Sequence, residues 1–165
     1  MRMLDFAMRI YVHVPSQTLD LLEGGDLRRR YVVSTSSYGI GTELGSNRTP
    51  PGRFRIAEKF GDGAPPGEIF RARLPTGEIG GEGEGADHVQ TRILWLDGID
   101  RENANTHERY IYIHGTNAES QLALPASHGC VRMSNLDVID LYDQVSVGDE
   151  VVIDPGDDPP GGPFV

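Results

Sequence analysis

Residues 127–142 read Ser-His-Gly-Cys-Val-Arg-Met-Ser-Asn-Leu-Asp-Val-Ile-Asp-Leu-Tyr, a polar turn that leads directly into an amphipathic segment. Ser134 or Asn135 is a suitable N-cap, and Asp137 favours the positively polarised first turn of a helix. The apolar residues that follow form one face of that helix: Leu136, Val138, Ile139, Tyr142 and Val145. The stretch therefore predicts one substantial helix, placed a few residues after a cysteine.

The rest of the chain reads as short strands separated by turns. Apolar runs bounded by Gly, Pro and Asp predict strands at residues 8–14, 18–23, 27–34, 53–59, 91–96, 110–114 and 150–153. Short turns join the first three, which predicts an antiparallel start, and the arginines at 28–30 are expected on an exposed strand edge. We therefore expect a mainly β fold, a β-sandwich or mixed sheet with one substantial helix after the cysteine.

Composition limits the class of partner. The 165 residues suit one domain, and the 21 glycines and 11 prolines fit a fold rich in turns. A formal net charge of −10 argues against nucleic acid and anionic membranes as partners. Asp5 and Arg9 interrupt the apolar core that a signal peptide needs, which predicts a cytoplasmic protein. A periplasmic or cell-wall location is the alternative if the native protein carries a leader.

Residues 61–85 differ from the rest of the chain. They are rich in Gly, Pro and acidic residues around one apolar pair, Ile69 and Phe70. An insertion of this length in a compact domain is either a functional lid or a disordered loop, and the sequence leaves both readings open. The expected organisation is a catalytic domain over residues 1–154, with this lid-like insertion, and a Pro-, Gly- and Asp-rich tail over residues 155–165.

Cys130 is the only cysteine, so its surroundings decide its role. A thiol is mostly neutral near pH 7 and needs a base or an electropositive setting to become a thiolate. His114, at the end of a predicted strand, is the residue type best matched to that task. The predicted helix N-terminus after Cys130 favours negative charge, and the N–H groups around Gly129 and Cys130 suit an oxyanion hole. Arg132 is a fixed cation suited to binding a carboxylate.

Two segments carry a family resemblance. His-Gly-Thr at 114–116 and Ser-His-Gly-Cys-Val-Arg-Met at 127–133 resemble the active-site signature of the L,D-transpeptidase (YkuD-domain) family, bacterial enzymes that act on peptidoglycan stem peptides. Residues 36–42 resemble the family's glycine-rich turn, and Thr-Pro-Pro-Gly-Arg-Phe at 49–54 resembles another of its segments. The resemblance spans about residues 8–154 and implies a YkuD-type fold.

The resemblance also implies a thioester mechanism. Cys130 would attack the carbonyl of the third stem residue, usually meso-diaminopimelate, and expel the D-Ala at position four. His114 would be the base, with its ring oriented by the carbonyl of the adjacent Gly115. The implied catalytic residues are thus Cys130, His114, Gly115 and Gly129, and the implied substrate-binding residues are Arg132, Ser127 and His128. Carbapenems are the expected covalent inhibitors.

Several alternatives stay open. A zinc site built from His114, His128 and Cys130 lacks the usual cysteine pairs, so no metal or other cofactor is expected. The acyl acceptor is either water, which makes the protein an L,D-carboxypeptidase, or an amine, which makes it a crosslinking L,D-transpeptidase. A cytoplasmic location favours a carboxypeptidase that trims murein tetrapeptide during recycling, and an exported chain favours the transpeptidase. A catalytically silent wall-peptide binding module is the non-enzymatic alternative.

Overall fold

The computed structural model describes residues 7–83 and 88–156, and most of its elements are strands. The strands are β1 (Met8–His13), β2 (Thr18–Glu23), β3 (Asp26–Ser34), β4 (Gly52–Phe60), β5 (Glu68–Arg71), β6 (Leu74–Ile79), β7 (Val89–Gly98), β8 (Tyr112–Thr116), β9 (Val131–Met133) and β10 (Glu150–Asp154). The helices are α1 (Asn135–Tyr142) and two short 3-10 helices, η2 (His107–Arg109) and η3 (Glu119–Gln121). Within the described ranges, no helix is long and apolar enough to cross a membrane.

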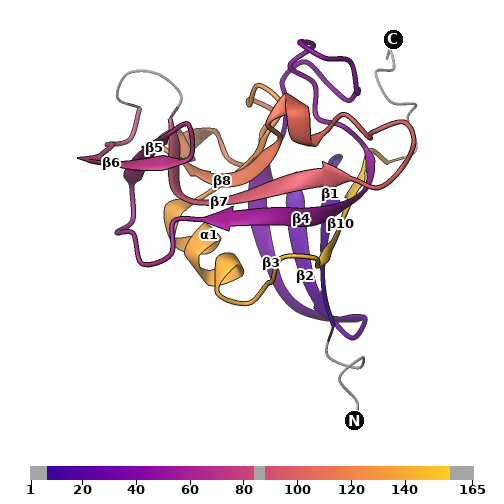
Figure 1. Cartoon of the computed structure of the whole chain (residues 1–165), viewed down its shortest axis with the longest axis horizontal. Coiled ribbons are helices and arrows are strands. Elements are labelled where there is room, and N and C mark those ends of the chain that lie inside the picture. The colour runs from indigo at the N-terminus through magenta and orange to yellow at the C-terminus, as the bar shows by residue number, and fades with distance from the viewer. Residues whose placement is uncertain (1–6, 84–87, 157–165) are drawn as a thin grey trace.

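The strands form one mixed sheet that closes on itself. Their order is β4-β10-β1-β2-β3-β9-β8-β7-β5-β6, and β4 pairs additionally with β7, so the strands from β4 round to β7 make a ring. Figure 1 shows β7 and β4 crossing in front of β1, β2 and β3. The β1–β10 and β8–β9 pairs are parallel, and the antiparallel start from β1 to β3 is as predicted. The expected mainly β fold class is confirmed.

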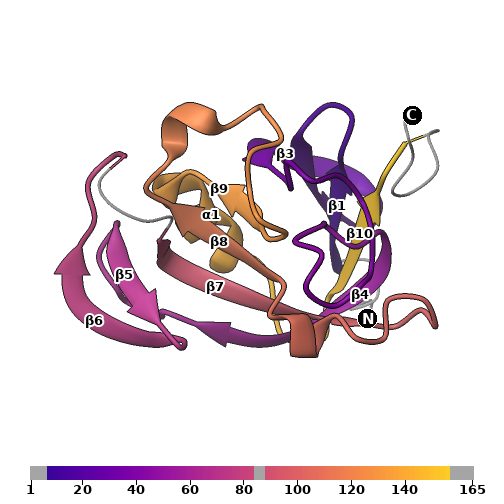
Figure 2. The ribbon, with the colours of Figure 1, turned by 90° about the horizontal axis from the view of Figure 1, so that it is seen from above.

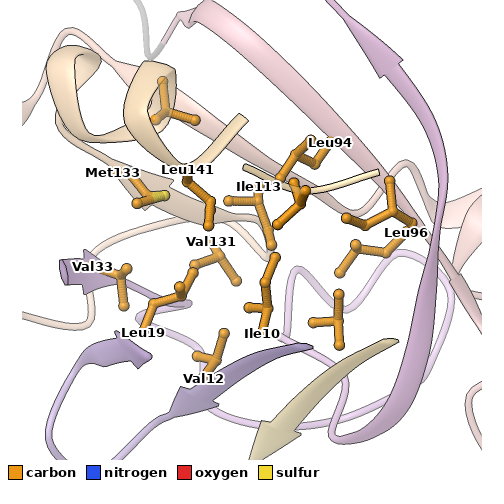
Figure 3. Close-up of a cluster of buried hydrophobic side chains, with 14 of the residues drawn as sticks. Ile10, Val12, Leu19, Val33, Leu94, Leu96, Ile113, Val131, Met133 and Leu141 are labelled. Atoms are coloured by element: carbon orange, nitrogen blue, oxygen red, sulfur yellow. The ribbon is translucent and has the colours of Figure 1, made fainter. Parts of the chain in front are cut away.

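The hydrophobic core fills this ring. Side chains from β1, β2, β3, β7, β8, β9 and α1 point toward one another (Figure 3). The completely buried members include Ile10, Val12, Leu19, Val33, Leu94, Leu96, Ile113, Val131, Met133 and Leu141, each at 0% exposure. Because strand side chains alternate between two faces, this inner row leaves every second residue of β7, β8 and β9 on the outer face.

Helix α1 has the predicted start. The Ser134 hydroxyl accepts a hydrogen bond from the Asp137 backbone N–H at 3.1 Å, which identifies Ser134 as the N-cap. At the other end, Lys59 Nζ of β4 donates to the carbonyl oxygens of Tyr142 at 2.8 Å and Val145 at 2.6 Å. The prediction that Leu136 belongs to the apolar face is wrong, because its side chain is 70% exposed.

Residues 61–83 are ordered as an extension of the sheet, so the disordered-loop reading is wrong for them. β5 and β6 form a hairpin, and Ile69 and Phe70 pair with Gln90 and Val89 of β7. Ile69 and Phe70 are each only 5% exposed, which explains how one apolar pair anchors a segment of otherwise polar composition. Figure 2 shows this hairpin beyond β7, outside the ring. Residues 84 and 85 of the predicted insertion, and 157–165 of the predicted tail, lie outside the described residues.

Two strand predictions need correction. β8 begins at Tyr112 and runs to Thr116, so His114 lies in the middle of the strand and not at its end. The three-residue strand β9 was not predicted, because Val131–Met133 is too short to show a pattern. The arginines at 28–30 lie on β3 and form ion pairs with Glu23, Asp140 and Asp20, as expected for a charged strand edge.

Candidate functional site

The two segments with catalytic chemistry lie side by side on the outer face of the ring. In the parallel β8–β9 pair, His114 is opposite Arg132 and Ile113 is opposite Val131. Ile113 and Val131 are core residues, so Tyr112 and His114 point to the outer face by alternation. Cys130 immediately precedes β9, which brings the sequence motif at 127–133 beside the histidine strand.

A second apolar cluster covers this outer face. We call it the outer cluster, and its buried members are Phe70, Ile93, Trp95 and Tyr112. Cys130 is one of the partly buried residues packed against it. Around Trp95, the His107 ring stacks at 3.8 Å and the Tyr112 ring meets it edge-on at 5.7 Å between centroids. The half-buried thiol therefore lies at the rim of an aromatic surface.

Backbone groups of Tyr112 and Tyr110 contact the Cys130 sulfur. The Tyr112 N–H donates to Sγ at 3.3 Å, and the thiol donates to the Tyr110 carbonyl oxygen at 3.4 Å. Tyr110 has φ 58°, a left-handed conformation that costs a bulky residue roughly 1–2 kcal/mol. The strained backbone of Tyr110 thus places its carbonyl oxygen against the neutral Cys130 thiol. The Tyr112 N–H that donates to the sulfur favours the thiolate once the thiol is deprotonated.

His114 has an orientation suited to a general base. Its side chain is 3% exposed, and Nδ1 lies 2.5 Å from the Gly115 carbonyl oxygen. A carbonyl oxygen only accepts hydrogen bonds, so Nδ1 carries the proton and Nε2 carries the lone pair in the neutral ring. The His114 ring lies edge-on to the Tyr112 ring, with centroids 6.5 Å apart. Tyr112 therefore contacts both residues, Cys130 through its backbone N–H and His114 through its ring.

Ser127 and Gly129 shape the turn that presents the cysteine. The buried Ser127 hydroxyl donates to the Cys130 carbonyl at 2.6 Å and accepts from the Gly129 N–H at 3.3 Å. Thr49 Oγ1 donates to the Gly129 carbonyl at 3.0 Å, which ties the turn to the segment before β4. Gly129 has φ 123°, which favours glycine. Because Ser127 already uses the Gly129 N–H, an oxyanion role for that group requires the turn to rearrange.

The prediction that a helix N-terminus activates Cys130 is wrong. β9 separates Cys130 from the Ser134 N-cap, and an extended strand of that length places them roughly 10 Å apart or more. The N–H of Asn135 in the first turn is also occupied, donating to Glu119 Oε2 at 2.7 Å. The helix dipole falls off within its first turn and does not reach the thiol.

Arg109 supplies positive charge near the thiol instead. Burial lowers the pKa of Arg109, and the nearby charges of Glu43 and of a Cys130 thiolate oppose that shift. Its guanidinium is fixed by the Arg48 carbonyl oxygen at 2.6 Å and the Gly41 carbonyl oxygen at 3.3 Å. Because these hydrogen bonds hold the Arg109 guanidinium in place, its positive charge favours the thiolate form of Cys130.

The predicted substrate-binding residues lie in different environments. Arg132 is 2% exposed, and its Nη1 donates to Gln121 Oε1 at 2.9 Å, so in this structure it supports the segment after β8. Ser127 is 1% exposed and shapes the turn. His128 is exposed and lies 6.1 Å from the Tyr38 ring. A direct contact between any of these three residues and substrate stays a prediction.

Asn135 is a site residue that sequence reasoning assigned only to the helix start. Its Nδ2 donates to the Thr116 carbonyl at 3.2 Å, and its Oδ1 accepts from Thr91 Oγ1 at 2.6 Å. A Cβ on Gly115 would lie 2.4 Å from Asn135 Oδ1, so glycine is required there for the close approach. Asn135 thus fixes the backbone whose carbonyl orients His114. Its polar partners come from other strands, and no local pattern marks them.

Metal ligation was the rival reading of the same residues. Among residues 7–83 and 88–156, no group of three or more His, Cys, Asp and Glu side chains gathers as metal ligands do. The Cys130 sulfur contacts backbone groups and His114 Nδ1 contacts a carbonyl. The zinc alternative from His114, His128 and Cys130 has no supporting geometry there.

A large cavity lies apart from this chemistry. It has a volume of about 680 Å³ and is lined by acidic residues that include Glu43, Asp100, Glu102 and Asp154. Neither Cys130 nor His114 lines it. The chemistry of the residues therefore locates the candidate site on the outer face, and not in this cavity.

Comparison with known proteins identifies the family of the chain. Residues 7–153 match the family model of the YkuD L,D-transpeptidase catalytic domain. A Bacillus subtilis (strain 168) protein assigned to the L,D-transpeptidases, YqjB, is 28% identical over 116 residues, which cover 70% of this chain and 57% of that protein. The chain thus spans little more than half the length of this relative.

Solved structures show the same fold. An L,D-transpeptidase from Mycobacterium smegmatis matches 90% of this chain and 58% of its own, with a TM-score of 0.59 at 19% identity. L,D-transpeptidase 3 from Mycobacterium tuberculosis, solved in complex with a faropenem-derived adduct, matches 90% of this chain and 60% of its own, with a TM-score of 0.60 at 16% identity. At these identities the likeness concerns the fold.

Proposed function

The chain belongs to the L,D-transpeptidase (YkuD) family, and on that premise we propose that it transfers an acyl group from a peptidoglycan stem peptide through a thioester on Cys130. One arrangement carries the proposal: Tyr112 donates its backbone N–H to the Cys130 sulfur, and its ring meets the His114 ring edge-on. His114 offers Nε2 as proton acceptor because Gly115 holds Nδ1. A thiol and an oriented imidazole that adjoin the same residue are the groups that cysteine acyl transfer requires.

The proposed reaction has two steps. His114 Nε2 takes the Cys130 thiol proton, and the sulfur attacks the carbonyl carbon of the third stem residue. The C–N bond to D-Ala breaks, and His114 returns the proton to the departing amine nitrogen. Water then attacks the thioester carbon while His114 accepts its proton, the C–S bond breaks, and the proton passes back to sulfur.

Water as the acyl acceptor makes the enzyme an L,D-carboxypeptidase, which is the form of the proposal that we favour. The β5–β6 hairpin supports it, because its turn residue Arg73 lies over Trp95 and Tyr110 beside the nucleophile and narrows the approach of a second peptide strand. In this proposal the substrate is a free murein tetrapeptide handled during cytoplasmic recycling. Crosslinking by an amine acceptor is the second candidate, and the activity named for the relatives favours it.

The hairpin in residues 61–83 acts, in this proposal, as a lid over the stem-peptide site. Its base is attached to β7 through Ile69 and Phe70, and its turn reaches the outer cluster through Arg73. Lids of this kind exclude water and order around substrate. A carboxypeptidase must admit one water, so in this proposal the lid restricts large acceptors and leaves the Cys130 site accessible to solvent.

Release of D-Ala from a free tetrapeptide tests the proposal. We expect D-Ala release without any amine acceptor, and loss of release in Cys130→Ala with the fold retained. Exposure to a carbapenem should give one covalent adduct on Cys130; the support is a solved L,D-transpeptidase, LdtMt1, in complex with imipenem. Circular dichroism of the variant is the folding control.

Three outcomes decide between the candidates. Turnover that appears only with an added amine acceptor favours the transpeptidase. Peptide binding without D-Ala release or a thioester favours the silent binding module. Full D-Ala release by Cys130→Ala contradicts the whole assignment, because Cys130 is the only thiol in the chain.

A further inference from the structure

The turn of the β5–β6 hairpin has an unusual conformation. Ala72 and Arg73, the two residues between the strands, have φ 49° and 65°. Hairpin turns with two positive φ values strongly prefer Asn-Gly or Gly-Gly, because a Cβ is disfavoured there. Each of these side chains costs roughly 1–2 kcal/mol in this conformation. Strain at an exposed turn often serves function, and here it directs an arginine side chain.

The Arg73 guanidinium lies on the aromatic surface beside the nucleophile. Its central carbon is 4.6 Å from the Trp95 ring centroid and 5.6 Å from that of Tyr110. Its Nη1 donates to the Tyr112 hydroxyl at 3.1 Å. Stacking on Trp95 leaves the edge of the planar group, where its N–H donors lie, able to face a ligand.

The same two tyrosines connect Arg73 to Cys130. Tyr112 binds Arg73 through its hydroxyl and donates its backbone N–H to the Cys130 sulfur. The Tyr110 ring lies near the Arg73 guanidinium, and the Tyr110 carbonyl oxygen accepts a hydrogen bond from the Cys130 thiol. Arg73 is thus linked to the Cys130 sulfur through Tyr112 and Tyr110, each of which contacts both residues.

Other arginines near this face have different surroundings. Arg109 is held by backbone carbonyl oxygens, and Arg132 is 2% exposed. Arg71, on the same hairpin, lies 3.8 Å from Glu78 with its side chain 61% exposed. Of these arginines, Arg73 is the one whose guanidinium contacts Trp95 and Tyr112 of the outer cluster.

We propose that Arg73 is a specificity-determining residue that binds the C-terminal carboxylate of the residue expelled from the stem peptide. The inference rests on the proposed function, which makes a terminal D-Ala the leaving residue. Its carboxylate lies only a few bonds beyond the scissile carbonyl, on the side away from the thioester that forms. A planar guanidinium binds a carboxylate through two parallel hydrogen bonds.

A pair of substrates that differ in one charge tests the proposal. The free tetrapeptide is compared with its C-terminal amide, in the wild-type protein and in Arg73→Gln. We expect Arg73→Gln to lower kcat/KM for the free acid by about 10- to 100-fold, the usual size of a hydrogen bond to a charged group. The amide should change by less than about threefold, since it lacks the charge that Arg73 recognises. Arg71→Gln is the matched control and should alter neither substrate.

Two results would overturn the assignment. Equal losses for acid and amide in Arg73→Gln would give Arg73 a structural role in the hairpin. An unchanged preference for the acid would give carboxylate binding to another residue. Arg73→Lys, which keeps the charge but not the fork, should recover only part of the preference.

Alkylation of Cys130 separates this inference from the proposed function. The rates with anionic iodoacetate and neutral iodoacetamide are compared, because neither reagent depends on peptide chemistry. Arg73→Gln should lower the iodoacetate-to-iodoacetamide ratio by about twofold, as expected for one partly screened charge. A protein that releases no D-Ala yet shows this change loses the proposed function but keeps Arg73 as an anion-binding residue. An unchanged ratio counts against Arg73 whether or not the enzyme turns over.

Discussion

At the scale of single residues, His114 is buried with its ring held by the Gly115 carbonyl, whereas His128 is exposed. Gly115 holds the Nδ1 proton of His114, which leaves Nε2 as the acceptor on the face that carries Cys130. A base that is oriented in advance does not have to lose ring freedom at the moment of reaction. This arrangement gives His114, and not His128, the role of base in our proposal.

We expect His114→Gln to lower the acylation rate by roughly 10²–10⁴-fold, the usual contribution of a positioned base. Glutamine suits the test because its amide can still donate to the Gly115 carbonyl, so the 3%-exposed position is filled. His128→Gln is the matched control, and its rate should stay within about threefold. Single-turnover acylation by tetrapeptide or a carbapenem gives the rates. A larger loss in His128→Gln than in His114→Gln would mean that the base is misassigned.

The sequence identifies the reacting residues better than their supports. Cys130 and His114 lie in short motifs, so their chemistry can be inferred from neighbouring residues. The supports act across the fold: Thr91 binds Asn135 from 44 positions away, and Arg109 binds the Arg48 carbonyl from 61. Contacts of that range depend on strand pairing, which local patterns do not determine.

At the scale of elements, the β5–β6 hairpin shows why composition is a poor guide to order in residues 61–85. Residues 61–85 are mostly Gly, Pro and acids, which predicts poor packing. Residues 61–83 are nevertheless ordered, because Ile69 and Phe70 are buried and β5 pairs with the free edge of β7. The sequence does not reveal that β7 outruns β4 and leaves an edge for β5, because that depends on strand length and register.

The other end of the hairpin is held by a carboxylate. Glu82 accepts the backbone N–H of Glu119 at 2.9 Å and that of Ser120 at 3.1 Å, both in η3. The hydrogen bond from Ser120 is the main cause that lowers the pKa of Glu82 below 4.5. A lowered pKa means that the contact is strongest for the ionised group. The contact is therefore fully present above about pH 4.5 and is lost as the pH falls through the lowered value.

We expect Glu82→Gln to speed amide exchange at Glu119 and Ser120 at pH 7, because a neutral amide accepts these hydrogen bonds less well. In the wild-type protein, protection of the same amides, corrected for intrinsic exchange, should fall as the pH drops below about 4.5. The variant should show no such step. Glu78→Gln, an exposed change on the same hairpin, is the control. Identical pH profiles for wild type and Glu82→Gln would remove Glu82 from this role.

At the scale of the whole molecule, the last strand closes the ring. β10 lies between β1 and β4, so the first, fourth and last strands meet there. The strand at 150–153 was predicted, but its central place was not, because a parallel partner at the opposite end of the chain leaves no local signal. Its inward residues Val151 and Ile153 are 0% and 1% exposed, which makes β10 part of the core.

A closed ring should unfold as one unit, and Ile153→Ala tests this. Truncation of a buried isoleucine typically costs about 2–5 kcal/mol in the free energy of unfolding. Ile79→Ala, at a 58%-exposed hairpin position, should cost less than about 0.5 kcal/mol.

Trp95 is the only tryptophan and lies on β7 in the outer cluster, so its fluorescence reports on the catalytic face. If β10 and the catalytic face unfold cooperatively, the fluorescence and circular dichroism transitions in urea should coincide and shift together in Ile153→Ala. A fluorescence transition that stays in place while the circular dichroism transition moves would show that the catalytic face is stable without the closing strand.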